Sequence, residues 1–506
     1  MNGTFKPLFV CVTAAVILSA IVRPVLAQSP LNDDRVMLQG FYWESCRFGH
    51  PDRFPTMGKE HWYDIVKKDA DAIRAARFNM VWLPQPCYAG ENSAGYNPKE
   101  YFKLDNSYGS FTEQRALLKT LLSDGVEPIA DIVINHRDSE HGWTGFVNPA
   151  WGLWSICGDD EAFTDPRSEA YNAPMSQRGA PEEWDTPYAN HKAYAYPAFR
   201  DIDHTNVTVR RDIVRFLLEL KSAGYRGWRY DMVHGYNARW VALYNRLTKP
   251  TFTVGEYDWG AHEEARGWVL ATETSPGKLA SASDVFDFYT LWTLKDNKTN
   301  VVRWGGEGNG PGLIGDTTGG IEWKQKAVTF IENHDTGYRT NDDGTPQPGH
   351  DHDTFANNWE AEQAYAFILT HPGVPCVYWK HYFDSGADLR NKIRALINAR
   401  KVAGVNSGST VVIQNNAIGR GVYAAKVSGT HGSLYVRIGG SDADWTPSMS
   451  HFSGYREYAV GSGWHVWVAL PGNPAFQQAP IPRALSAPPV YRPGNTIEVS
   501  AKEVGG

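Results

Sequence analysis

Short apolar runs alternate with longer amphipathic segments over most of this chain. Runs rich in β-branched and aromatic residues begin at Val36, Asn79 and Glu127, and residues 62–76 and 111–125 between them carry apolar side chains at helical spacing. The alternation is interrupted once and then resumes, and eight strand candidates can be counted in all. Strands that alternate with helices build parallel sheets, and eight such units close into a (β/α)8 barrel. The sequence therefore predicts an α/β protein with a TIM-barrel domain.

Three stretches depart from this repeat. Residues 137–198 are rich in Gly, Pro, Trp and Asp and are too long for an ordinary loop, so we expect an inserted subdomain after the third strand. Residues 28–136 and 199–404 then make the barrel. Residues 405–470 hold short strand-like runs separated by turn residues, which predicts a C-terminal antiparallel β domain. The Pro-rich residues 471–506 predict an extended or disordered tail.

The amino terminus has the pattern of a secretory signal. Lys6 precedes an apolar stretch, and Val25, Leu26 and Ala27 form a small-residue cleavage site. We expect residues 1–27 to be removed and the mature protein to be secreted. An uncleaved membrane anchor is the alternative, but the apolar stretch is shorter than the ~20 residues that span a bilayer. No later segment is apolar enough to span one, so we expect no membrane association.

Charge and cysteine content restrict the function further. The chain carries 49 Lys and Arg against 56 Asp and Glu, a net charge of −7, and it has no run of basic residues. This composition offers no basic field for nucleic acid and favours an uncharged substrate. The cysteines after the signal segment are far apart in sequence, and a core of this size needs no crosslink. We expect buried thiols without disulfide bonds at Cys46, Cys87, Cys157 and Cys376.

Three acidic residues stand where predicted parallel strands end. Asp231, Glu256 and Asp335 each follow an apolar or β-branched run, in GWRYDMVH, FTVGEY and VTFIENHD. The carboxyl ends of barrel strands meet on one face, where barrel enzymes carry their active sites. Glycosidic hydrolysis with retention needs one carboxyl group to attack the sugar and another to protonate the leaving oxygen, and a third can stabilise the transition state. Arg229, two residues before Asp231 on the same strand face, can keep that carboxylate ionised.

A single acid at a strand end is usually a surface cap, but the surrounding motifs resemble a known family. DIVINH at residues 131–136, GWRYDMVH, VGEY and FIENHD match, in order and spacing, the signature regions of the α-amylase family of glycoside hydrolases, family 13. VMLQGFYWES, GYNPKEYF, DIDHTN and AYAFILTHPGVPCVYW are similar to plant-type α-amylases and bacterial maltotetraose-forming amylases. The resemblance spans nearly the whole chain after the signal segment.

The resemblance implies a role for each matched residue. It makes Asp231 the nucleophile, Glu256 the general acid/base and Asp335 the stabiliser of the transition state. Other residues of the matched motifs are expected to contact the sugar, namely Arg229, His136, His334 and Tyr96. The position three after the nucleophile, often Lys or Arg in the family, is His234, which we also expect to contact substrate. Two residues after Glu256 the family's usual Trp is replaced by Asp258, so the leaving-group side of the site should differ.

The resemblance also implies a structural calcium ion between the barrel and the inserted subdomain. Its expected ligands are Asn135, Asp201 and the backbone carbonyl of Gly235, and such oxygen ligands suit Ca²⁺. A further acidic ligand should come from the insert, with Asp185 and Asp160 as the candidates. Without the ion, Asn135 and Asp201 would be a backbone-capping amide and a turn cap.

These features predict a secreted, monomeric, calcium-binding endo-acting α-amylase. It would hydrolyse α-1,4-glucosidic bonds in starch, glycogen and maltooligosaccharides, and bind neither nucleic acid nor membranes. The first alternative is an exo-acting maltooligosaccharide-forming amylase such as a maltotetraohydrolase, because the same residues serve both modes and only the blocking of subsites differs. The second is a catalytically silent family member that binds glucans, although the presence of all three acids argues against it.

Overall fold

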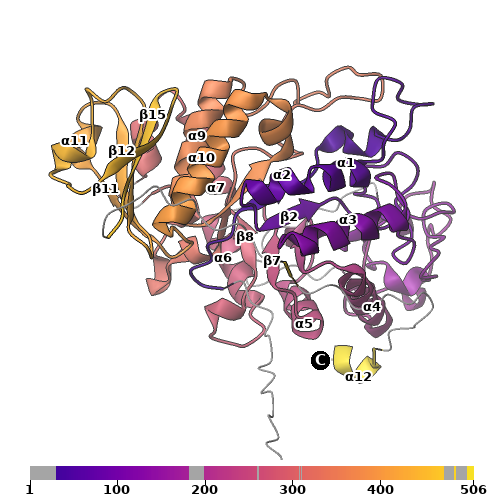
Figure 1. The fold of residues 1–506 in the computed structure, drawn as a ribbon. Helices are drawn as coiled ribbons and strands as arrows, with labels where there is room; N and C mark the ends of the chain where they lie inside the picture. The colour runs from indigo at the N-terminus through magenta and orange to yellow at the C-terminus, as the bar shows by residue number, and fades with distance from the viewer. Residues whose placement is uncertain are drawn as a thin grey trace, which may run out of the picture.

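The computed structural model describes residues 30–181, 199–258, 261–306, 308, 310–471, 484–485 and 499–505. The expected signal segment and Asp185 lie outside these residues, as do parts of the inserted subdomain and of the tail. Figure 1 shows helices around a central barrel and a separate β-sheet to one side of it.

A closed barrel of parallel strands forms the centre of the protein. Its strands are β1 (Met37–Gln39), β2 (Met80–Leu83), β3 (Glu127–Ile132), β6 (Gly227–Tyr230), β7 (Phe252–Gly255), β8 (Asp284–Phe286), β9 (Ala327–Thr329) and β10 (Val374–Tyr378). They follow the order β1-β10-β9-β8-β7-β6-β3-β2 around the barrel. All of their residues except Glu127 are buried, because helices cover the outside and side chains fill the inside. The predicted TIM barrel is confirmed.

Helices between the strands form the outer layer. They are α1 (Trp62–Lys68), α2 (Ala70–Ala75), α3 (Phe111–Ser123), α4 (Val207–Ala223), α5 (Ala238–Thr248), α6 (His262–Ala271), α7 (Phe288–Asp296), α8 (Gly312–Gly315), α9 (Asn358–Thr370) and α10 (Ala387–Ala403). The predicted helix over residues 62–76 is divided at Asp69, which separates α1 from α2. Residues 283–289 look like one strand in the sequence, but β8 ends at Phe286. Asp287 then caps α7 by accepting a hydrogen bond from the backbone N–H of Thr290 at 3.0 Å.

The inserted segment leaves the barrel after β3 and is tied together at its base. A two-stranded antiparallel sheet joins β4 (His136–Arg137) to β5 (Arg200–Asp201). Arg137 is fully buried and donates hydrogen bonds to the carbonyls of Lys99 and Pro149 at 2.6 and 2.9 Å. This guanidinium therefore fixes the insert against the loop that follows β2. The described part of the insert contains 3-10 turns at Leu153–Ser155, Glu161–Phe163 and Met175–Gln177.

A five-stranded antiparallel sheet follows the barrel, as predicted. Its strands are β11 (Thr410–Ile413), β12 (Tyr423–Ser428), β13 (Ser433–Ile438), β14 (Arg456–Gly461) and β15 (Trp464–Ala469), in the order β11-β12-β13-β15-β14. The short α11 (Asn415–Ile418) joins the first two strands. The sheet packs on α9 and α10, beside which it lies in Figure 1. The sequence did not predict β11 and β14, because these edge strands are partly exposed and their apolar pattern is weak.

The described parts of the C-terminal tail are anchored to the barrel. The backbone N–H of Leu485 donates a hydrogen bond to the carbonyl of Leu122 at the end of α3. A short helix, α12 (Ala501–Val504), lies beside α4, far from the C-terminal sheet in Figure 1. Val504 is buried there, and its carbonyl accepts a hydrogen bond from Arg210 Nε at 2.7 Å. The tail was expected to be extended or disordered, yet its described residues pack on the barrel.

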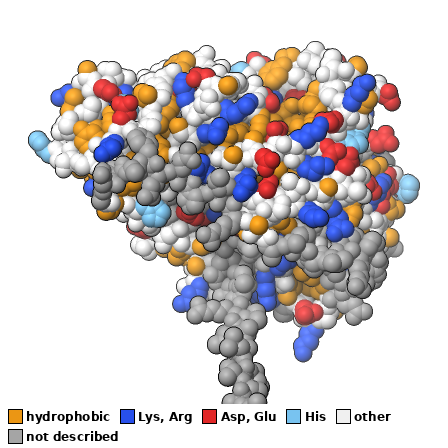
Figure 2. Space-filling model, in the orientation of Figure 1, with side chains coloured by type: hydrophobic (Ala, Val, Ile, Leu, Met, Phe, Trp, Pro, Cys, Tyr) orange, Lys and Arg blue, Asp and Glu red, His pale blue; other side chains and the backbone are white. Residues whose placement is uncertain are grey.

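The distribution of surface charge and the state of the cysteines match what the sequence led us to expect. Lys and Arg side chains are interspersed with Asp and Glu on the face shown in Figure 2. Within the described ranges, no helix is long and apolar enough to cross a membrane. Each of the four described cysteines is buried, and no disulfide bond joins them to one another: Cys46, Cys87, Cys157 and Cys376.

Candidate active site

The three predicted acids meet at the carboxyl ends of the barrel strands. Asp231 follows β6 directly, Glu256 follows β7, and Asp335 lies on the turn after β9. All three line one cavity of about 890 Å³. The topology explains this convergence, because parallel strands of a barrel all end on the same face. The other walls of the cavity include the aromatic side chains of Trp43, Tyr96, Phe199, Phe288 and Trp292.

Arg229 joins the two acids that were expected to act as a pair. Its guanidinium is fully buried, and its Nη1 donates a hydrogen bond to Asp231 at 2.7 Å. Its Nη2 lies 2.7 Å from Glu256 Oε1, but among the described residues this nitrogen has no partner in hydrogen-bond geometry. The guanidinium is therefore aligned with Asp231 and only in ionic contact with Glu256. The carboxyl groups of Asp231 and Glu256 therefore both contact the one guanidinium of Arg229 inside the TIM barrel.

Asp131 completes this buried network. It lies opposite Arg229 in the register of β3 and β6, and it accepts a hydrogen bond from Arg229 Nη1 at 2.8 Å. Its other oxygen accepts hydrogen bonds from Trp82 Nε1 at 3.1 Å and from the hydroxyl of Tyr96 at 2.9 Å. The sequence placed Asp131 inside a family motif but gave it no role. The available signal was an acid in the middle of an apolar strand, which must find a cation when the strand is buried.

Burial and like charges shift the titration of the acid pair. Burial raises the pKa of Glu256, and although Arg229 opposes this effect, the negative charges of Asp258 and Asp335 add to it. Burial also raises the pKa of Asp231, again against the effect of Arg229 and with a contribution from Glu256. Two carboxyl groups that share one cation cannot both ionise easily. The pair therefore keeps a shared proton at a higher pH than two isolated carboxyl groups would.

Asp335 has the opposite shift. Partial burial tends to raise the pKa of Asp335, but His334 and Arg339 outweigh this effect and hold the pKa below its usual range. The ion-pair distances are 2.9 Å from His334 Nε2 and 2.9 Å from Arg339 Nη1. Asp335 therefore stays ionised when its neighbour Glu256 is protonated. The cavity thus contains one permanent carboxylate beside a pair that can exchange a proton.

The predicted sugar-contacting side chains form a connected wall. The rings of Tyr96 and His334 are nearly parallel, with centroids 5.1 Å apart and an interplanar angle of 9°. His136 Nε2 lies 2.8 Å from the backbone carbonyl oxygen of Tyr96, and burial lowers the pKa of His136 to about 4. His136 is therefore neutral at ordinary pH. Tyr96 and His136 both line the cavity, whereas His334 lies behind Asp335.

His234 and Asp258 form a pair on another wall of the cavity. His234 Nδ1 lies 3.2 Å from Asp258 Oδ1, and both residues line the cavity. These are the two positions at which the sequence departs from the family pattern. The departures are therefore adjacent in space, and they place an imidazole and a carboxylate next to Glu256.

The expected calcium ligands are brought together at the base of the insert. Asn135 is buried, and its Oδ1 has no hydrogen-bond partner among the described residues. A Cβ atom on Gly235 would collide with this oxygen, so only glycine permits the approach. Asp201 is buried next to Ile202, whose N–H donates a hydrogen bond to the carbonyl of Asn135 at 3.0 Å. These oxygen atoms suit Ca²⁺.

Asp160, one of the two acids expected from the insert as a calcium ligand, is engaged in other contacts. Asp160 forms an ion pair with Arg200 at 2.5 Å and accepts a hydrogen bond from the backbone N–H of Asp201 at 2.8 Å. Its carboxylate therefore ties the insert to β5. Asp185 lies outside the described residues. In the part of the chain that the structure covers, no group of three or more His, Cys, Asp or Glu side chains is arranged to hold a metal.

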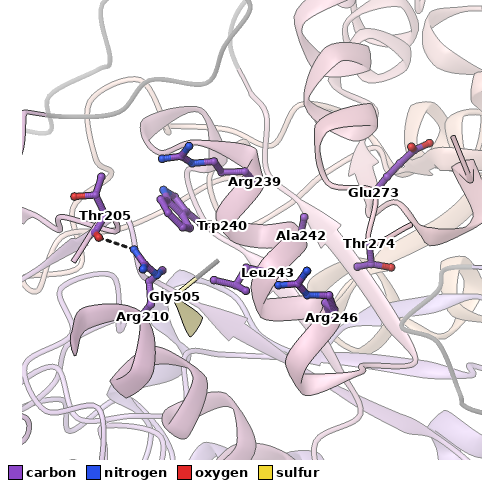
Figure 3. Close-up of a pocket in the computed structure, with 10 residues that line it drawn as sticks. All are labelled: Thr205, Arg210, Arg239, Trp240, Ala242, Leu243, Arg246, Glu273, Thr274 and Gly505. Atoms are coloured by element: carbon purple, nitrogen blue, oxygen red, sulfur yellow. Dashed lines mark hydrogen bonds between the residues drawn. The ribbon is translucent and has the colours of Figure 1, made fainter. Parts of the chain in front are cut away.

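A second cavity, of about 500 Å³, lies among the outer helices and α12 (Figure 3). Arg210, Arg239 and Arg246 give it a basic lining, and two of these guanidinium groups lie 4.7 and 4.3 Å from the ring of Trp240. Arg210 donates hydrogen bonds to backbone carbonyls, including that of Thr205, as Figure 3 shows. None of the predicted site residues lines this cavity. The acids of the first cavity therefore define the candidate active site.

Comparison with known proteins agrees with the geometry. Residues 51–253 match the family model described as alpha amylase, catalytic domain, and residues 402–468 match the alpha-amylase C-terminal beta-sheet domain. The chain belongs to the α-amylase family of glycoside hydrolases. As an α-amylase family member it is a glycosidase. The first model matches part of the barrel, from β2 into β7, and the second matches the C-terminal sheet.

Relatives within the α-amylase family span most of the chain. Probable alpha-amylase 2 of Arabidopsis thaliana is 29% identical over 459 residues, which cover 86% of this chain and 95% of that protein. Glucan 1,4-alpha-maltotetraohydrolase of Stutzerimonas stutzeri is 29% identical over 426 residues, or 80% of this chain and 68% of the relative. The crystal structure of alpha-amylase from Geobacillus thermoleovorans in complex with acarbose has a TM-score of 0.57 at 12% identity, covering 87% of this chain and 98% of the other. The structural likeness concerns the fold.

Proposed function

We propose that the protein is an endo-acting α-amylase that hydrolyses α-1,4-glucosidic bonds in starch, glycogen and maltooligosaccharides with retention. The observation that carries this proposal is the convergence of Asp231 and Glu256 on the guanidinium of Arg229, within the cavity that Asp335 also lines. Retaining glycosidases keep their two carboxyl groups about 5 Å apart, and contact with a single guanidinium keeps the pair close. The family relationship supports the substrate class.

In the first step, Asp231 attacks the anomeric carbon while Glu256 gives its proton to the departing glycosidic oxygen. A covalent glycosyl ester on Asp231 results, and the leaving chain departs with the proton. In the second step, Glu256 takes a proton from water, and the water oxygen displaces Asp231 from the same carbon. Two inversions give net retention, and both side chains return to their starting states.

The contacts of Arg229 support this division of roles. A hydrogen bond to a guanidinium favours the ionised form of Asp231. Glu256 lacks such alignment and faces additional negative charge from Asp258 and Asp335. The proton that the pair holds therefore belongs on Glu256, which is the arrangement the first step requires.

The remaining side chains bind and orient the sugar. Asp335 accepts hydrogen bonds from sugar hydroxyls and counters the positive charge that develops at the anomeric carbon. Tyr96 provides an aromatic face for the ring, and His136, as a neutral imidazole, can bind a hydroxyl. His334, which is buried behind Asp335, acts on the sugar through that carboxylate, and His234 meets the leaving-group side together with Asp258.

We also propose that Asn135, Asp201 and the Gly235 carbonyl hold a calcium ion. The support is a buried amide oxygen without a hydrogen-bond partner in the described residues, next to a glycine that admits close approach. The ion would join β3, the base of the insert and the loop after β6, and it would supply rigidity. We expect EDTA to lower the melting temperature, and Ca²⁺ but not Mg²⁺ to restore it. An unchanged melting curve, together with metal analysis that finds no calcium, would remove this proposal.

The product profile tests the function. We expect soluble starch to give mixed oligosaccharides early in the reaction, and an end-blocked maltooligosaccharide to be cleaved internally. One dominant short product and no attack on the blocked substrate would establish the exo-acting alternative, which the maltotetraohydrolase relatives favour. No product from either substrate would leave the silent glucan-binding alternative. Proton NMR of the first product should show the α anomer, and a β anomer would contradict retention.

We further propose that residues 1–27 are a signal segment and that the mature protein is a secreted monomer. N-terminal sequencing of protein recovered from the medium should begin at Gln28. Light scattering should give the mass of one chain. Retention in the cell with Met1 intact would contradict secretion, and a doubled mass would contradict the monomer.

A further inference from the structure

Asp335 is the most accessible of the three acids. Its side chain is 41% exposed, compared with 6% for Asp231 and 9% for Glu256. Asp231 and Glu256 are continuous with strands, whereas Asp335 stands on a turn, where its own N–H donates a hydrogen bond to Asn333 Oδ1 at 2.8 Å. The strand ends fix the first two acids. The orientation of Asp335 needs another restraint.

Two side chains contact this carboxylate, one at each oxygen. His334 Nε2 lies 2.9 Å from Oδ2, and Arg339 Nη1 donates a hydrogen bond to Oδ1 at 2.9 Å. His334 is itself held from behind, since its Nδ1 lies 2.9 Å from Gln39 Nε2. Among the described residues His334 Nε2 has no partner in hydrogen-bond geometry, so the hydrogen bond from Arg339 is the contact that fixes the orientation of the carboxylate.

Contacts of both the side chain and the backbone hold Arg339 in place. Its guanidinium carbon lies 4.4 Å from the centroid of the Trp43 ring, and its second terminal nitrogen contacts His350 Nε2. Its backbone N–H donates to the carbonyl of His350 at 3.0 Å, and its carbonyl accepts from Gln347 N–H at 2.9 Å. The side chain is only 13% exposed. Few other orientations are open to it.

The loop that carries Arg339 is docked on the amino-terminal part of the barrel. Thr340 donates hydrogen bonds to Glu44 Oε1 from its backbone N–H at 2.7 Å and from its hydroxyl at 3.1 Å. Arg47 donates to the hydroxyl and the carbonyl of Thr340 at 2.8 and 2.6 Å. Glu44 and Arg47 belong to the same 3-10 turn as Trp43, Trp43–Arg47. The loop and this turn therefore form one frame around Arg339.

We propose that Arg339 is a positioning residue that fixes the orientation and the charge of Asp335 before substrate enters the cavity. This inference rests on the proposed role of Asp335 as stabiliser of the transition state. A preorganised carboxylate costs no reorientation during the reaction, whereas a mobile one does. The other charged or titratable groups that face Asp335 are Arg229, Glu256, His334, His350 and Tyr96. In the described chain, His334 and Arg339 are the residues that place a side-chain nitrogen within 3 Å of its carboxylate.

The test compares three variants in steady-state kinetics on a chromogenic maltooligosaccharide. We expect R339Q to lower kcat about 10- to 100-fold, with KM changed less than about threefold, because a displaced group near the reacting carbon costs transition-state stabilisation more than binding. R339K keeps the charge but not the planar fork, so its kcat should lie between those of R339Q and the wild type. R53Q is the matched control. Arg53 pairs with Asp342 of the same loop at 2.5 Å and does not touch Asp335.

The pH profile separates positioning from a purely structural role. Loss of this positive charge raises the pKa of Asp335 and of the carboxylates beside it in the cavity, so the acidic limb of kcat/KM should move to higher pH in R339Q, and less in R339K. R53Q should keep the kcat of the wild type and the same acidic limb of kcat/KM. A kcat for R339Q within twofold of wild type, a loss equal to that of R53Q, or identical pH profiles for R339Q and R339K would overturn the inference. If R339Q fails to fold, R339K decides instead. A kcat for R339K within twofold of wild type, a loss equal to that of R53Q, or an acidic limb identical to that of the wild type would then overturn the inference. An inactive wild type would instead remove the proposed function.

Discussion

Asp131→Asn removes one charge from the buried network without changing the size of the side chain. The carboxylate accepts three hydrogen bonds, from Arg229, Trp82 and Tyr96. An amide has only one acceptor oxygen. If that oxygen faces Arg229, the N–H of Trp82 loses its acceptor, since Asp131 is the partner that it has in the described structure. Tyr96 can adapt, because its hydroxyl is able to accept a hydrogen bond from the amide.

The magnitude follows from these losses. A buried donor without an acceptor costs ~1–3 kcal/mol, and replacing a charge-assisted hydrogen bond by a neutral one costs about 1 kcal/mol more. We therefore expect Asp131→Asn to lower the free energy of unfolding by roughly 2–4 kcal/mol. The unfolding entropy of a chain of 506 residues is about 1 kcal/mol per kelvin, which gives a melting temperature lower by ~2–4 °C.

Scanning calorimetry of four proteins measures this effect: the wild type, W82F, D131N and the double variant. In the double variant Phe replaces Trp82, and its ring has no indole N–H that could be left without an acceptor. D131N should therefore lower the free energy of unfolding by ~1–3 kcal/mol less in that background. The acidic limb of kcat/KM should also move to lower pH in D131N, because the charge of Asp131 raises the pKa of Asp231. Strictly additive effects in the calorimeter, or a melting temperature for D131N equal to that of the wild type, would refute the reasoning.

Three further predictions concern the acids and the thiols. D231N and E256Q should each lower kcat by about 10³-fold or more with an unchanged circular dichroism spectrum, and turnover near the wild-type rate would contradict the assigned roles. D258N removes a charge that raises the pKa of Glu256, so the alkaline limb of kcat/KM should move to lower pH; a shift to higher pH would contradict this coupling. Burial raises the pKa of Cys46 and Cys87 to about 12, so these thiols should react with Ellman's reagent only after the protein is unfolded. A colorimetric thiol titration measures this, and rapid reaction of the native protein would contradict the burial.

The sequence predicted those features that depend on periodicity and on strand ends. Asp231, Glu256 and Asp335 could be placed on one face because barrel topology alone fixes where parallel strands end. Arg229 followed from the two-residue period of a strand. The eight strands and the C-terminal sheet were found because their apolar runs are long enough to recognise. Their bounds were less certain, and the run 283–289 contains both the end of β8 and the start of α7.

The sequence could not predict contacts that depend on chain segments meeting across the fold. Asp131 and Arg229 are 98 residues apart, and they become partners only because β3 and β6 are neighbours despite the insert between them. Arg339 is close to Asp335 in sequence, but its direction depends on a loop whose conformation no periodicity describes. Trp43 belongs to a family-like segment, yet its place over Arg339 depends on the docking of that loop. The roles of all the site residues remain predictions for the experiments above.

The network around Arg229 has a consequence for inhibitors. The carboxyl groups of Asp131, Asp231, Glu256 and Asp335 outnumber the guanidinium groups of Arg229 and Arg339, so the cavity has a deficit of positive charge even when Glu256 is protonated. A sugar-sized compound with a protonated ring nitrogen would supply the missing charge at the position where the transition state develops its own. Such a compound should bind more tightly than the neutral sugar of the same shape, and its advantage should shrink as acid protonates Asp231.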